Sequence, residues 1–358
     1  MIISRTPFRI SFFGGGTDYP VWYKQHGGAV LATTIDKYSY ISCRYLPPFF
    51  DHRSRVAYSR IENVVSNHDV EHPSVRETLK FTGVHEGVEI HHDGDLPART
   101  GLGSSSSFTV GLLHALYALK HRMPTKMQLA LEAIHIERHR IGESVGSQDQ
   151  VSAAFGGFNK VIFTPNDEIT LRPVVLNPLR MLALQDHLML YFTGFARFAS
   201  QIAEKQIKNT NNKKNELFAI QEMVDEALGI LTGDEDICQF GKLLDESWKL
   251  KRSLTEYIST SQIDEIYEAA IGAGAIGGKL LGAGGGGFML IFAKPEDQGR
   301  IKEKLKKLLL VPFRFENSGS QIIFYDHNAC IQNHHSHEPN ASALAKTRLL
   351  WEEELPTQ

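Results

Sequence analysis

The positions of hydrophobic and polar residues divide the first half of the chain into strand-like and helix-like segments. β-Branched and aromatic residues between turn residues predict strands over Arg9–Phe13, Val30–Tyr45, Arg55–Ser59 and Glu86–His92. Apolar residues recur at helical spacing after Ser107, and helices are expected over Ser74–Phe81 and Thr125–Arg140. Phe158–Phe163 and Ile169–Val174 are expected to close this half as a hairpin.

The second half predicts fewer strands, with helices between them. Strands are expected at His187–Thr193, Phe288–Ala293, Pro312–Phe315 and Gln321–Tyr325. The expected helices are a long region over Ser200–Ile258 broken near Gly233, then Ile263–Ile276 and Glu296–Leu310. This order favours a small α+β sandwich. Pro173 and Pro178 suggest a boundary near residue 180, so we expect domains over 1–180 and 181–326, followed by a polar tail over 327–358.

Composition and charge exclude several classes of protein. With 358 residues and 42% hydrophobic composition, the chain can bury two cores. A net charge of -3 without a basic stripe argues against a nucleic-acid partner. Cys43, Cys238 and Cys330 lie far apart, which suits a reducing compartment and offers no zinc-ligand spacing. Since neither a signal peptide nor a membrane span is evident, a cytoplasmic protein is expected.

The tail is expected to contribute no metal site. It carries an amphipathic stretch at Ala341–Glu354 and a histidine cluster at His334, His335 and His337. Those histidines have no companion ligand in the sequence, so a solvated polar segment is the favoured interpretation.

Residues Gly101–Ser107 read Gly-Leu-Gly-Ser-Ser-Ser-Ser and join a predicted strand to a predicted helix. We name this segment the serine loop. Glycines let the backbone approach a ligand, and the N-terminus of a helix favours anions. A single serine would suffice as a helix cap, whereas four hydroxyls add donors and metal ligands. The loop therefore predicts a phosphate site, with simple capping as the alternative.

Two further glycine clusters occur, at Gly14–Gly16 and at Gly282–Gly287, which we name the glycine loop. The glycine loop formally matches the dinucleotide fingerprint G-x-G-x-x-G. That fingerprint requires a strand, a loop and then a helix, whereas here a helix at Ile263–Ile276 precedes the loop and a strand follows it. A Walker-type loop is also absent, because Leu follows both Gly241-Lys242 and Gly278-Lys279.

Taken together, the three clusters resemble the three motifs of the GHMP kinases, which phosphorylate small molecules. Pro7–Tyr19 is similar to their first motif, Pro97–Ser107 to the second and Lys279–Phe288 to the third, in family order and spacing. The resemblance implies an ATP-dependent kinase that uses Mg²⁺. It also implies an α+β, two-domain GHMP kinase fold, with an N-terminal ribosomal-protein-S5-like α/β domain and a C-terminal ferredoxin-like α+β domain.

Longer stretches resemble the heptose 7-phosphate kinase branch of that family: Thr33–Tyr38, Gln148–Gln150, Phe155–Asn159 and Gly277–Phe288. This resemblance implies phosphorylation of the anomeric hydroxyl of D-glycero-D-manno-heptose 7-phosphate to the 1,7-bisphosphate, for nucleotide-activated heptose. The alternatives are a fucose- or galactose-type sugar-1-kinase and a non-catalytic sugar or nucleotide sensor. The expected partners are ATP and a sugar phosphate, with a homodimer as one option for the oligomeric state.

The resemblance also assigns catalytic and metal-binding residues. Asp149 matches the family's catalytic aspartate, which accepts the proton of the sugar hydroxyl or aligns it, although an aspartate there also suits a helix cap. Arg9 would stabilise charge beside Asp149, or form a structural ion pair. Glu137 matches the magnesium-binding glutamate, paired first with Ser105 and otherwise with Ser104 or Ser106; the alternative is an exposed helix charge.

The remaining assignments concern the two substrates. The predicted ATP-phosphate contacts are Gly101, Leu102, Gly103, Ser104, Ser105, Ser106 and Ser107. The predicted sugar contacts are Gly15, Gly16, Thr17, Asp18, Lys37, Gly284 and Gly285. Many sugar-1-kinases of the family carry Glu-His where this chain has Gly15 and Gly16, which leaves room for a larger sugar. Candidate cations for a distal phosphate are Lys37, Arg99, Arg138, Arg140, Arg197 and Lys279.

Overall fold

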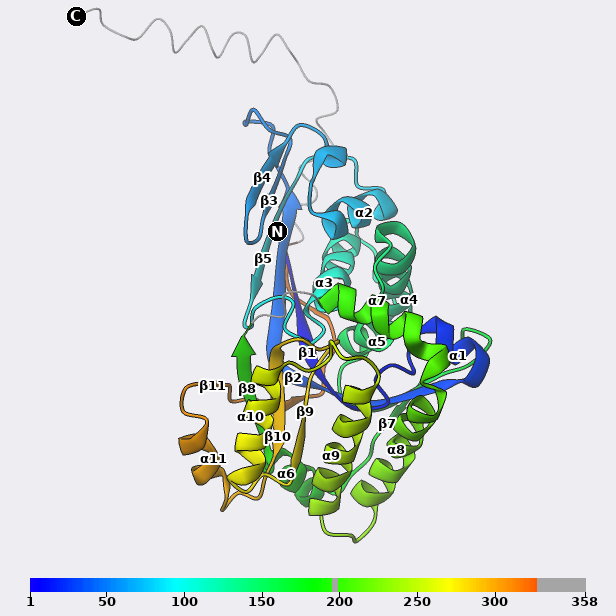
Figure 1. The fold of residues 1–358 in the computed structure, drawn as a ribbon. Coiled ribbons are helices and arrows are strands. Elements are labelled where there is room, and N and C mark those ends of the chain that lie inside the picture. The colour runs from blue at the N-terminus through cyan, green and yellow to red at the C-terminus, as the bar shows by residue number, and fades with distance from the viewer. Residues whose placement is uncertain (195–198, 327–358) are drawn as a thin grey trace, which may run out of the picture.

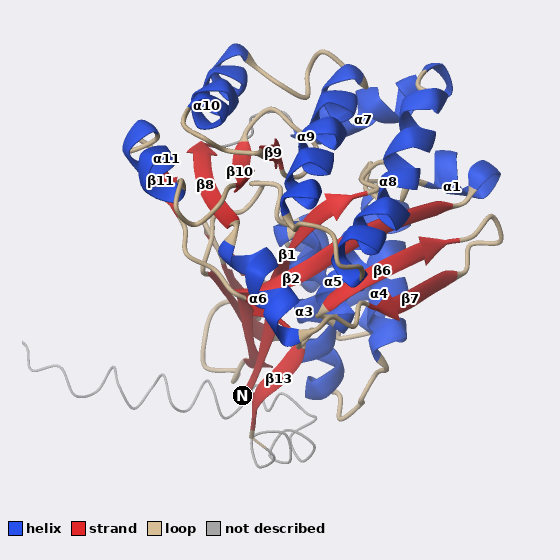
Figure 2. Ribbon diagram, turned by 90° about the horizontal axis from the view of Figure 1, so that it is seen from below, coloured by secondary structure: helices blue, strands red, loops and turns tan. Residues whose placement is uncertain are grey.

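A computed structural model of the chain describes residues 1–194 and 199–326. Within these residues a nine-stranded sheet runs in the order β13-β1-β2-β5-β3-β4, and off this path β6 and β12 pair with β2 and β7 pairs with β6. Its strands are β1 (Ile2–Phe13), β2 (Gly28–Tyr45), β3 (Ser54–Ala57), β4 (Ile61–Val64), β5 (Val88–Gly94), β6 (Phe158–Phe163), β7 (Ile169–Pro173), β12 (Phe315–Glu316) and β13 (Gln321–Tyr325). The 18-residue β2 pairs with β6 at one end and with β5 at the other, and Figure 2 shows β6 and β7 on the outer side of β2.

A second, four-stranded antiparallel sheet has the order β11-β8-β10-β9 in the described chain. Its strands are β8 (Leu188–Gly194), β9 (Gly277–Leu280), β10 (Gly287–Phe292) and β11 (Leu309–Leu310). Every residue of β9 and β10 is buried. The glycine loop connects these two strands, so a strand and not a helix follows it, as predicted.

Helices gather in an upper and a lower group (Figure 1). The upper group is α2 (Pro73–Thr82), α3 (Ser104–Leu119), α4 (Lys126–His135) and α5 (Gln148–Phe155), and α4 continues into a π-helical segment, Ile136–Ile141. The lower group is α6 (Pro178–Asp186), α8 (Lys214–Thr232), α9 (Cys238–Ser253), α10 (Ser261–Gly272) and α11 (Gln298–Lys304). Between the groups lie α1 (Pro20–His26) and α7 (Ala199–Asn209). Short 3₁₀ turns occupy Asn67–Asp69 and Thr210–Asn212.

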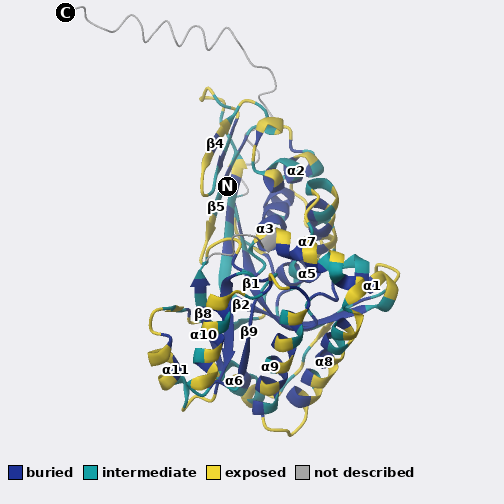
Figure 3. Cartoon of the chain, in the orientation of Figure 1, coloured by how far each residue is buried: buried dark blue, intermediate teal, exposed yellow. Residues whose placement is uncertain are grey.

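One apolar core joins the two sheets. Phe8, Ile10 and Phe12 of β1 share a buried cluster with residues of α8, α9 and the second sheet, among them Phe240 and Phe292. In Figure 3 the strands are mostly buried, while exposed residues follow the outer faces of the helices. Because side chains alternate along a strand, Arg9 and Ser11 point to the opposite face of β1, toward α3 and α5.

Several predicted elements differ from the structure for identifiable reasons. Pro178 is not simply a boundary signal: it occupies the first turn of α6, where the missing N–H costs nothing, behind an Asn177 cap. The expected helix over Glu296–Leu310 is wrong at its end, since α11 stops at Lys304 and Leu309–Leu310 pairs with β8. The helical region after Ser200 is interrupted at Thr210–Asn212 as well as near Gly233.

Short elements without strong periodicity were not anticipated, namely α1, β4, α6 and β9. In the described chain, β12 and β13 pair with β2 and β1 of the first sheet, although they fall within the predicted second domain. Cys330, the histidine cluster, Ala341–Glu354 and Arg197 lie outside the described residues. Among the described helices, none has the length and apolar character needed to cross a bilayer.

Candidate active site

The serine loop opens helix α3 without using a serine as a cap. The N-cap is Gly103, in the left-handed conformation at φ 75°, and no side chain caps the described helix start. Ser107 Oγ donates to the carbonyl of Pro7 (2.8 Å), and Ser104 Oγ accepts from the N–H of Arg99 (3.1 Å). Ser105 is exposed. The capping alternative is therefore contradicted, and the helix N-terminus stays open to an anion.

Asp149 and Arg9 form an ion pair beside this loop. Arg9 Nε and Nη2 lie 2.8 and 2.7 Å from Asp149 Oδ1, and Arg9 Nη1 donates to the carbonyl of Gly101 (2.7 Å). A Cβ added to Gly103 would lie 3.3 Å from Arg9 Cγ and 3.5 Å from Asp149 Cγ. Arg9 is buried, but the Asp149 side chain keeps 27% of its surface exposed. A charged acid therefore faces the same opening as the N-terminus of α3.

Asp149 does not cap its helix. The N-cap of α5 is Ser147, no side chain caps the described helix start, and Asp149 lies in the first turn. The capping alternative for this residue is contradicted, and its carboxylate is instead held by Arg9, whose Nε and Nη2 both contact Oδ1.

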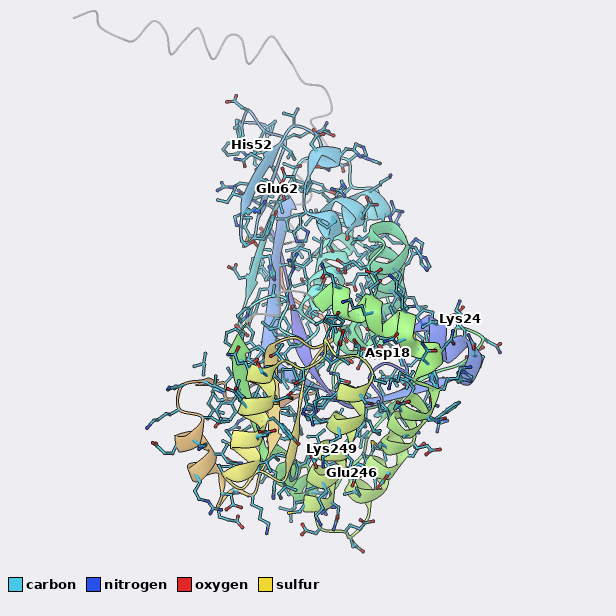
Figure 4. All side chains as sticks on the ribbon, viewed as in Figure 1. Asp18, Lys24, His52, Glu62, Glu246 and Lys249 are labelled. Carbon is cyan, nitrogen blue, oxygen red and sulfur yellow. The ribbon has the colours of Figure 1, made fainter. Side chains whose placement is uncertain are left out.

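Asp18 joins the Gly14–Gly16 turn to α5. Its Oδ1 accepts from the N–H of Gly16 (3.1 Å) and its Oδ2 from that of Gln148 (3.3 Å). Burial, and then the nearby Asp149 carboxylate, raise the pKa of Asp18. In Figure 4 Asp18 lies inside the fold, whereas Lys24 lies at its edge. Arg138 supports the junction by donating to Ser147 Oγ (2.6 Å).

Glu137 is fully buried on the π-helical segment, which contradicts the alternative of an exposed helix charge. Its Oε2 accepts from Ser106 Oγ (2.9 Å) and Gln150 Nε2 (2.5 Å), while its Oε1 has no partner in the described chain. Burial raises the pKa of Glu137 to about 7. A buried carboxylate with one unpaired oxygen suits a hard cation such as Mg²⁺, which prefers oxygen ligands.

The four serines of the loop differ in what they meet. The structure brings Ser106, rather than Ser105, to Glu137. Ser106 and Gln150 both donate to Oε2 of Glu137 and so orient its carboxylate. Ser105 is exposed.

The glycine loop packs directly against the serine loop. A Cβ on Gly282 would lie 2.3 Å from Gly101 Cα, and one on Gly287 would lie 2.3 Å from the carbonyl oxygen of Thr100. Lys251 Nζ donates to the carbonyls of Leu280 (3.0 Å) and Gly282 (2.6 Å), and Lys279 Nζ donates to Phe12 O (2.6 Å). Lys251 thus joins α9 to the glycine loop, and Lys279 joins β9 to β1.

The predicted sugar contacts and cations are dispersed. Ile258 and Ile202 fill the space that a Cβ on Gly284 and on Gly285 would occupy. Thr17 Oγ1 donates to the carbonyls of Gly14 in its own turn and Ala29 of β2. Lys37 pairs with Asp36, Arg140 pairs with Glu77, and Arg99 is exposed. None of these contacts identifies the group that would meet a distal phosphate.

Sequence reasoning did not single out Ser11, Gln148, Gln150 or Lys251. Because side chains alternate along a strand, the sequence places Ser11 on the same face of β1 as Arg9. This alternation could have identified Ser11 as a neighbour of the site. Gln148 and Gln150 flank Asp149 in the sequence. Lys251 gives no sequence signal, because its partners are backbone carbonyls about thirty residues further along the chain.

Comparison with known proteins agrees with this geometry. The family model described as GHMP kinases N terminal domain matches residues 72–157, and the GHMP kinases C terminal model matches residues 221–309. A D-glycero-alpha-D-manno-heptose 7-phosphate kinase of Campylobacter jejuni is 30% identical, over 86% of this chain and 93% of the relative.

Two solved structures have the same fold. A D-glycero-D-manno-heptose 1-phosphate kinase from Bacteroides thetaiotaomicron aligns with a TM-score of 0.75 at 24% identity, covering 90% of this chain and 99% of that one. A putative sugar kinase from Campylobacter jejuni aligns with a TM-score of 0.66 at 26% identity, covering 90% and 98%. With all three glycine motifs gathered around Asp149, the family models and the 30% identical relative show that this chain belongs to the GHMP kinase family, which transfers a phosphoryl group from ATP.

Proposed function

We propose that this chain transfers the γ-phosphoryl group of ATP to the anomeric hydroxyl of D-glycero-D-manno-heptose 7-phosphate, giving the 1,7-bisphosphate. The observation that supports phosphoryl transfer is the Arg9–Asp149 pair beside Gly103, at the open N-terminus of α3. The heptose assignment is supported by the sequence stretches shared with the heptose kinase branch, together with the Campylobacter jejuni relative of that name.

Some residues of the site bind the phosphates of ATP, and Asp149 accepts the proton of the sugar hydroxyl. The N–H groups at the start of α3 face the triphosphate, and Arg9 stabilises the charge that develops next to them. The partly exposed Asp149 carboxylate aligns the anomeric hydroxyl and accepts its proton as the O–P bond forms. Asp18 fixes the start of α5, and through it the position of Asp149.

The Glu137 site fits magnesium. Its unpaired Oε1 would be one ligand and the exposed Ser105 hydroxyl another, with Ser106 and Gln150 holding the carboxylate from its other oxygen. Bound there, Mg²⁺ would neutralise negative charge on the phosphates of ATP.

A substrate panel tests the proposal. Purified protein would be assayed for ADP release with heptose 7-phosphate, heptose 1-phosphate, galactose, fucose and mevalonate, and the product position would be fixed by phosphorus NMR. We expect the highest kcat/KM for heptose 7-phosphate, and a kcat about 10³-fold lower for Asp149→Asn. Preference for an unphosphorylated hexose would contradict the heptose assignment, and ligand binding without ADP release would favour the sensor.

A further inference from the structure

Strand β4 forms one edge of the nine-stranded sheet. Among the described residues it pairs with β3 alone, and Figure 1 shows it at the outer margin of the molecule. In Figure 4 its Glu62 lies far from Asp18 of the candidate active site. An edge strand offers a row of unpaired backbone groups to another strand, so proteins commonly protect such edges with charged residues or proline.

Two hydrogen bonds show which backbone groups of β4 face β3. The carbonyl of Arg60 accepts from the N–H of Tyr58 (2.8 Å). The carbonyl of Val64 accepts from the N–H of Arg53 (2.9 Å). Even-numbered residues of β4 therefore turn their backbone groups toward β3, and odd-numbered residues turn theirs outward, because this orientation alternates along a strand. In the described chain, no strand pairs with the outward N–H and C=O groups of Asn63.

The side chains on the open face of this edge are neutral and exposed. Ile61 is 61% exposed and Val65 is 70% exposed, and Asn63 between them is exposed as well. By contrast β7, an edge strand on another side of the same sheet, carries Arg172 and Pro173. The β4 edge therefore lacks the protection that β7 has.

The sequence of this edge is complementary to a second copy of itself. In an antiparallel pair centred on Asn63, the outward N–H and C=O groups of the two Asn63 residues bond to each other. The same register places Ile61 of each copy opposite Val65 of the other, so that two apolar pairs form on one face. A two-fold axis through Asn63 thus satisfies the free backbone groups and covers the exposed apolar side chains.

Residues around the strand fit the same arrangement. Antiparallel pairing lays the start of one strand beside the end of the other, and the exposed Arg60 precedes β4 whereas the exposed Asp69 follows it. Opposite charges of the two copies therefore approach each other at both ends. The loop before β3 adds apolar surface, since Phe49 is 85% and Phe50 53% exposed, and Arg53 links this loop to the end of β4. So short a strand pair buries less than the about 800 Å² per partner of a standard interface, which predicts a weak dimer.

We propose that two copies of this chain associate through β4, in an antiparallel pairing centred on Asn63 that joins their two nine-stranded sheets. Such an interface uses the same surface on both copies. The proposal goes beyond the kinase function and does not depend on which sugar is phosphorylated.

Sedimentation velocity over a concentration series of the full chain tests the association. We expect wild type to dimerise with a dissociation constant of about 10 µM. Asn63→Pro removes an outward N–H and no bond to β3, and Ile61→Lys places a charge opposite Val65. Each should raise the dissociation constant about tenfold or more, with kcat/KM changed less than twofold as evidence of folding.

Ile323→Lys is the matched control. Ile323 is also an exposed isoleucine, at 48%, and lies on β13 at the opposite end of the strand order. This variant should dimerise like wild type.

A disulfide tests the register, in a Cys330→Ser background. Residues opposite each other in a hydrogen-bonded antiparallel pair have Cα atoms about 5.5 Å apart, which a disulfide can span. Asn63→Cys should therefore form a covalent dimer under mild oxidation. Ile61→Cys should not, because its two copies would lie four residues apart along the strands, about 13 Å.

Three results would overturn the proposal. Wild type that stays monomeric over the whole concentration series would exclude a second copy as the partner of β4. A dimer that survives both Asn63→Pro and Ile61→Lys, or that is lost only in Ile323→Lys, would place the interface elsewhere. Crosslinking through Ile61→Cys but not Asn63→Cys would contradict the register. The substrate panel decides the kinase function separately in every case.

Discussion

The serine loop and the glycine loop are both rich in glycine and lie against each other, yet the structure uses their glycines in opposite ways. In the serine loop, Gly103 ends the loop at a helix start, and the nearest atoms to its open face belong to Arg9 and Asp149. In the glycine loop, Gly282 and Gly287 face the backbone of Gly101 and Thr100, at distances that no Cβ could tolerate. The serine loop leaves space for a ligand at Gly103, whereas the glycine loop lets two backbones pack in direct contact.

The comparison shows why a glycine pattern alone does not identify a binding site. Gly101 belongs to the serine loop by sequence, but its open face meets Leu281 O at 2.4 Å, so it serves packing. The spacing G-x-G-x-x-G in the glycine loop is a packing requirement, because its three glycines lie against the backbones of Gly101, Ile258 and Thr100. What separates the two loops is the element that follows, because only a helix start offers unpaired N–H groups to an anion.

Gly282→Ala should have the largest effect. Its Cβ would lie 2.3 Å from Gly101 Cα at φ 74°, so two backbones must move apart. We expect the free energy of unfolding to fall by about 4 kcal/mol, with kinase activity lost in parallel. Urea unfolding measures the change.

Gly229→Ala is the control for that variant, because a Cβ there, inside α8, meets no atom within 4 Å. It should leave activity unchanged and raise stability slightly. A Gly282→Ala protein as stable as wild type would show that the glycine loop is not a packing element.

Gly103→Ala should spare the fold and damage the reaction. The new methyl group would press on Arg9 Cγ at 3.3 Å and Asp149 Cγ at 3.5 Å, and would crowd the approach of the phosphates. We expect kcat/KM to fall about 100-fold, with a loss of stability near 1–2 kcal/mol from the left-handed backbone.

Gly142→Ala separates these two causes. Gly142 has φ 81°, and a Cβ there meets nothing within 4 Å, so the variant bears the backbone strain alone. If its kcat/KM fell as far as that of Gly103→Ala, strain and not crowding would explain the loss.

Sequence reasoning worked best for segments with a long, regular pattern of apolar residues. β2 and α3 were predicted near their observed bounds, because each buries a long apolar pattern with a regular period. The open helix start at Gly103 followed from local composition. The family and the enzyme class followed from the three motifs, and the comparisons confirm them. The roles given to Asp149, Glu137 and Asp18 stay predictions, although the structure brings Asp149 and Asp18 together.

The details that the sequence could not predict depend on contacts between distant segments. Successive residues of a helix differ in direction by about 100°, so which serine meets Glu137 depends on where α3 begins and how it packs. The pairing of β13 with β1 joins the two ends of the described chain, and no local pattern encodes it. β9 contains Gly277 and Gly278, which disfavour a strand in isolation, but pairing with β10 and close packing of Gly277 against Gly241 of α9 fix it at the edge of the sheet.

Ser105→Ala and Ser106→Ala test which hydroxyl of the serine loop binds the metal and which one orients Glu137. If Ser105 is the metal ligand, its loss should raise the Mg²⁺ concentration for half-maximal activity about tenfold, with stability unchanged. Ser106→Ala leaves Glu137 Oε2 with one hydrogen bond fewer, so it should lower the free energy of unfolding by about 1 kcal/mol. The reverse result would make Ser106 the ligand and Ser105 a surface residue.

Lys251→Met tests how α9 holds the glycine loop. Burial lowers the pKa of Lys251 to about 7 from its usual 10.5, with Arg9 adding to the shift, and burial also lowers the pKa of the nearby Lys279. Between these two pH values the unfolded chain holds a proton that the folded chain has released. The free energy of unfolding therefore rises with pH across this window, by about 1 kcal/mol per pH unit for this group.

The Lys251→Met protein should lack that contribution. The difference in unfolding free energy between wild type and variant should therefore move in favour of wild type from pH 7 to pH 10, as measured by urea unfolding. Lys249→Met on the exposed face of the same helix, where Lys249 pairs only with Asp245, should leave the wild-type slope intact. A flat difference would mean that the folded chain keeps Lys251 protonated, so that an ammonium group and not an uncharged amine donates to the carbonyls of Leu280 and Gly282.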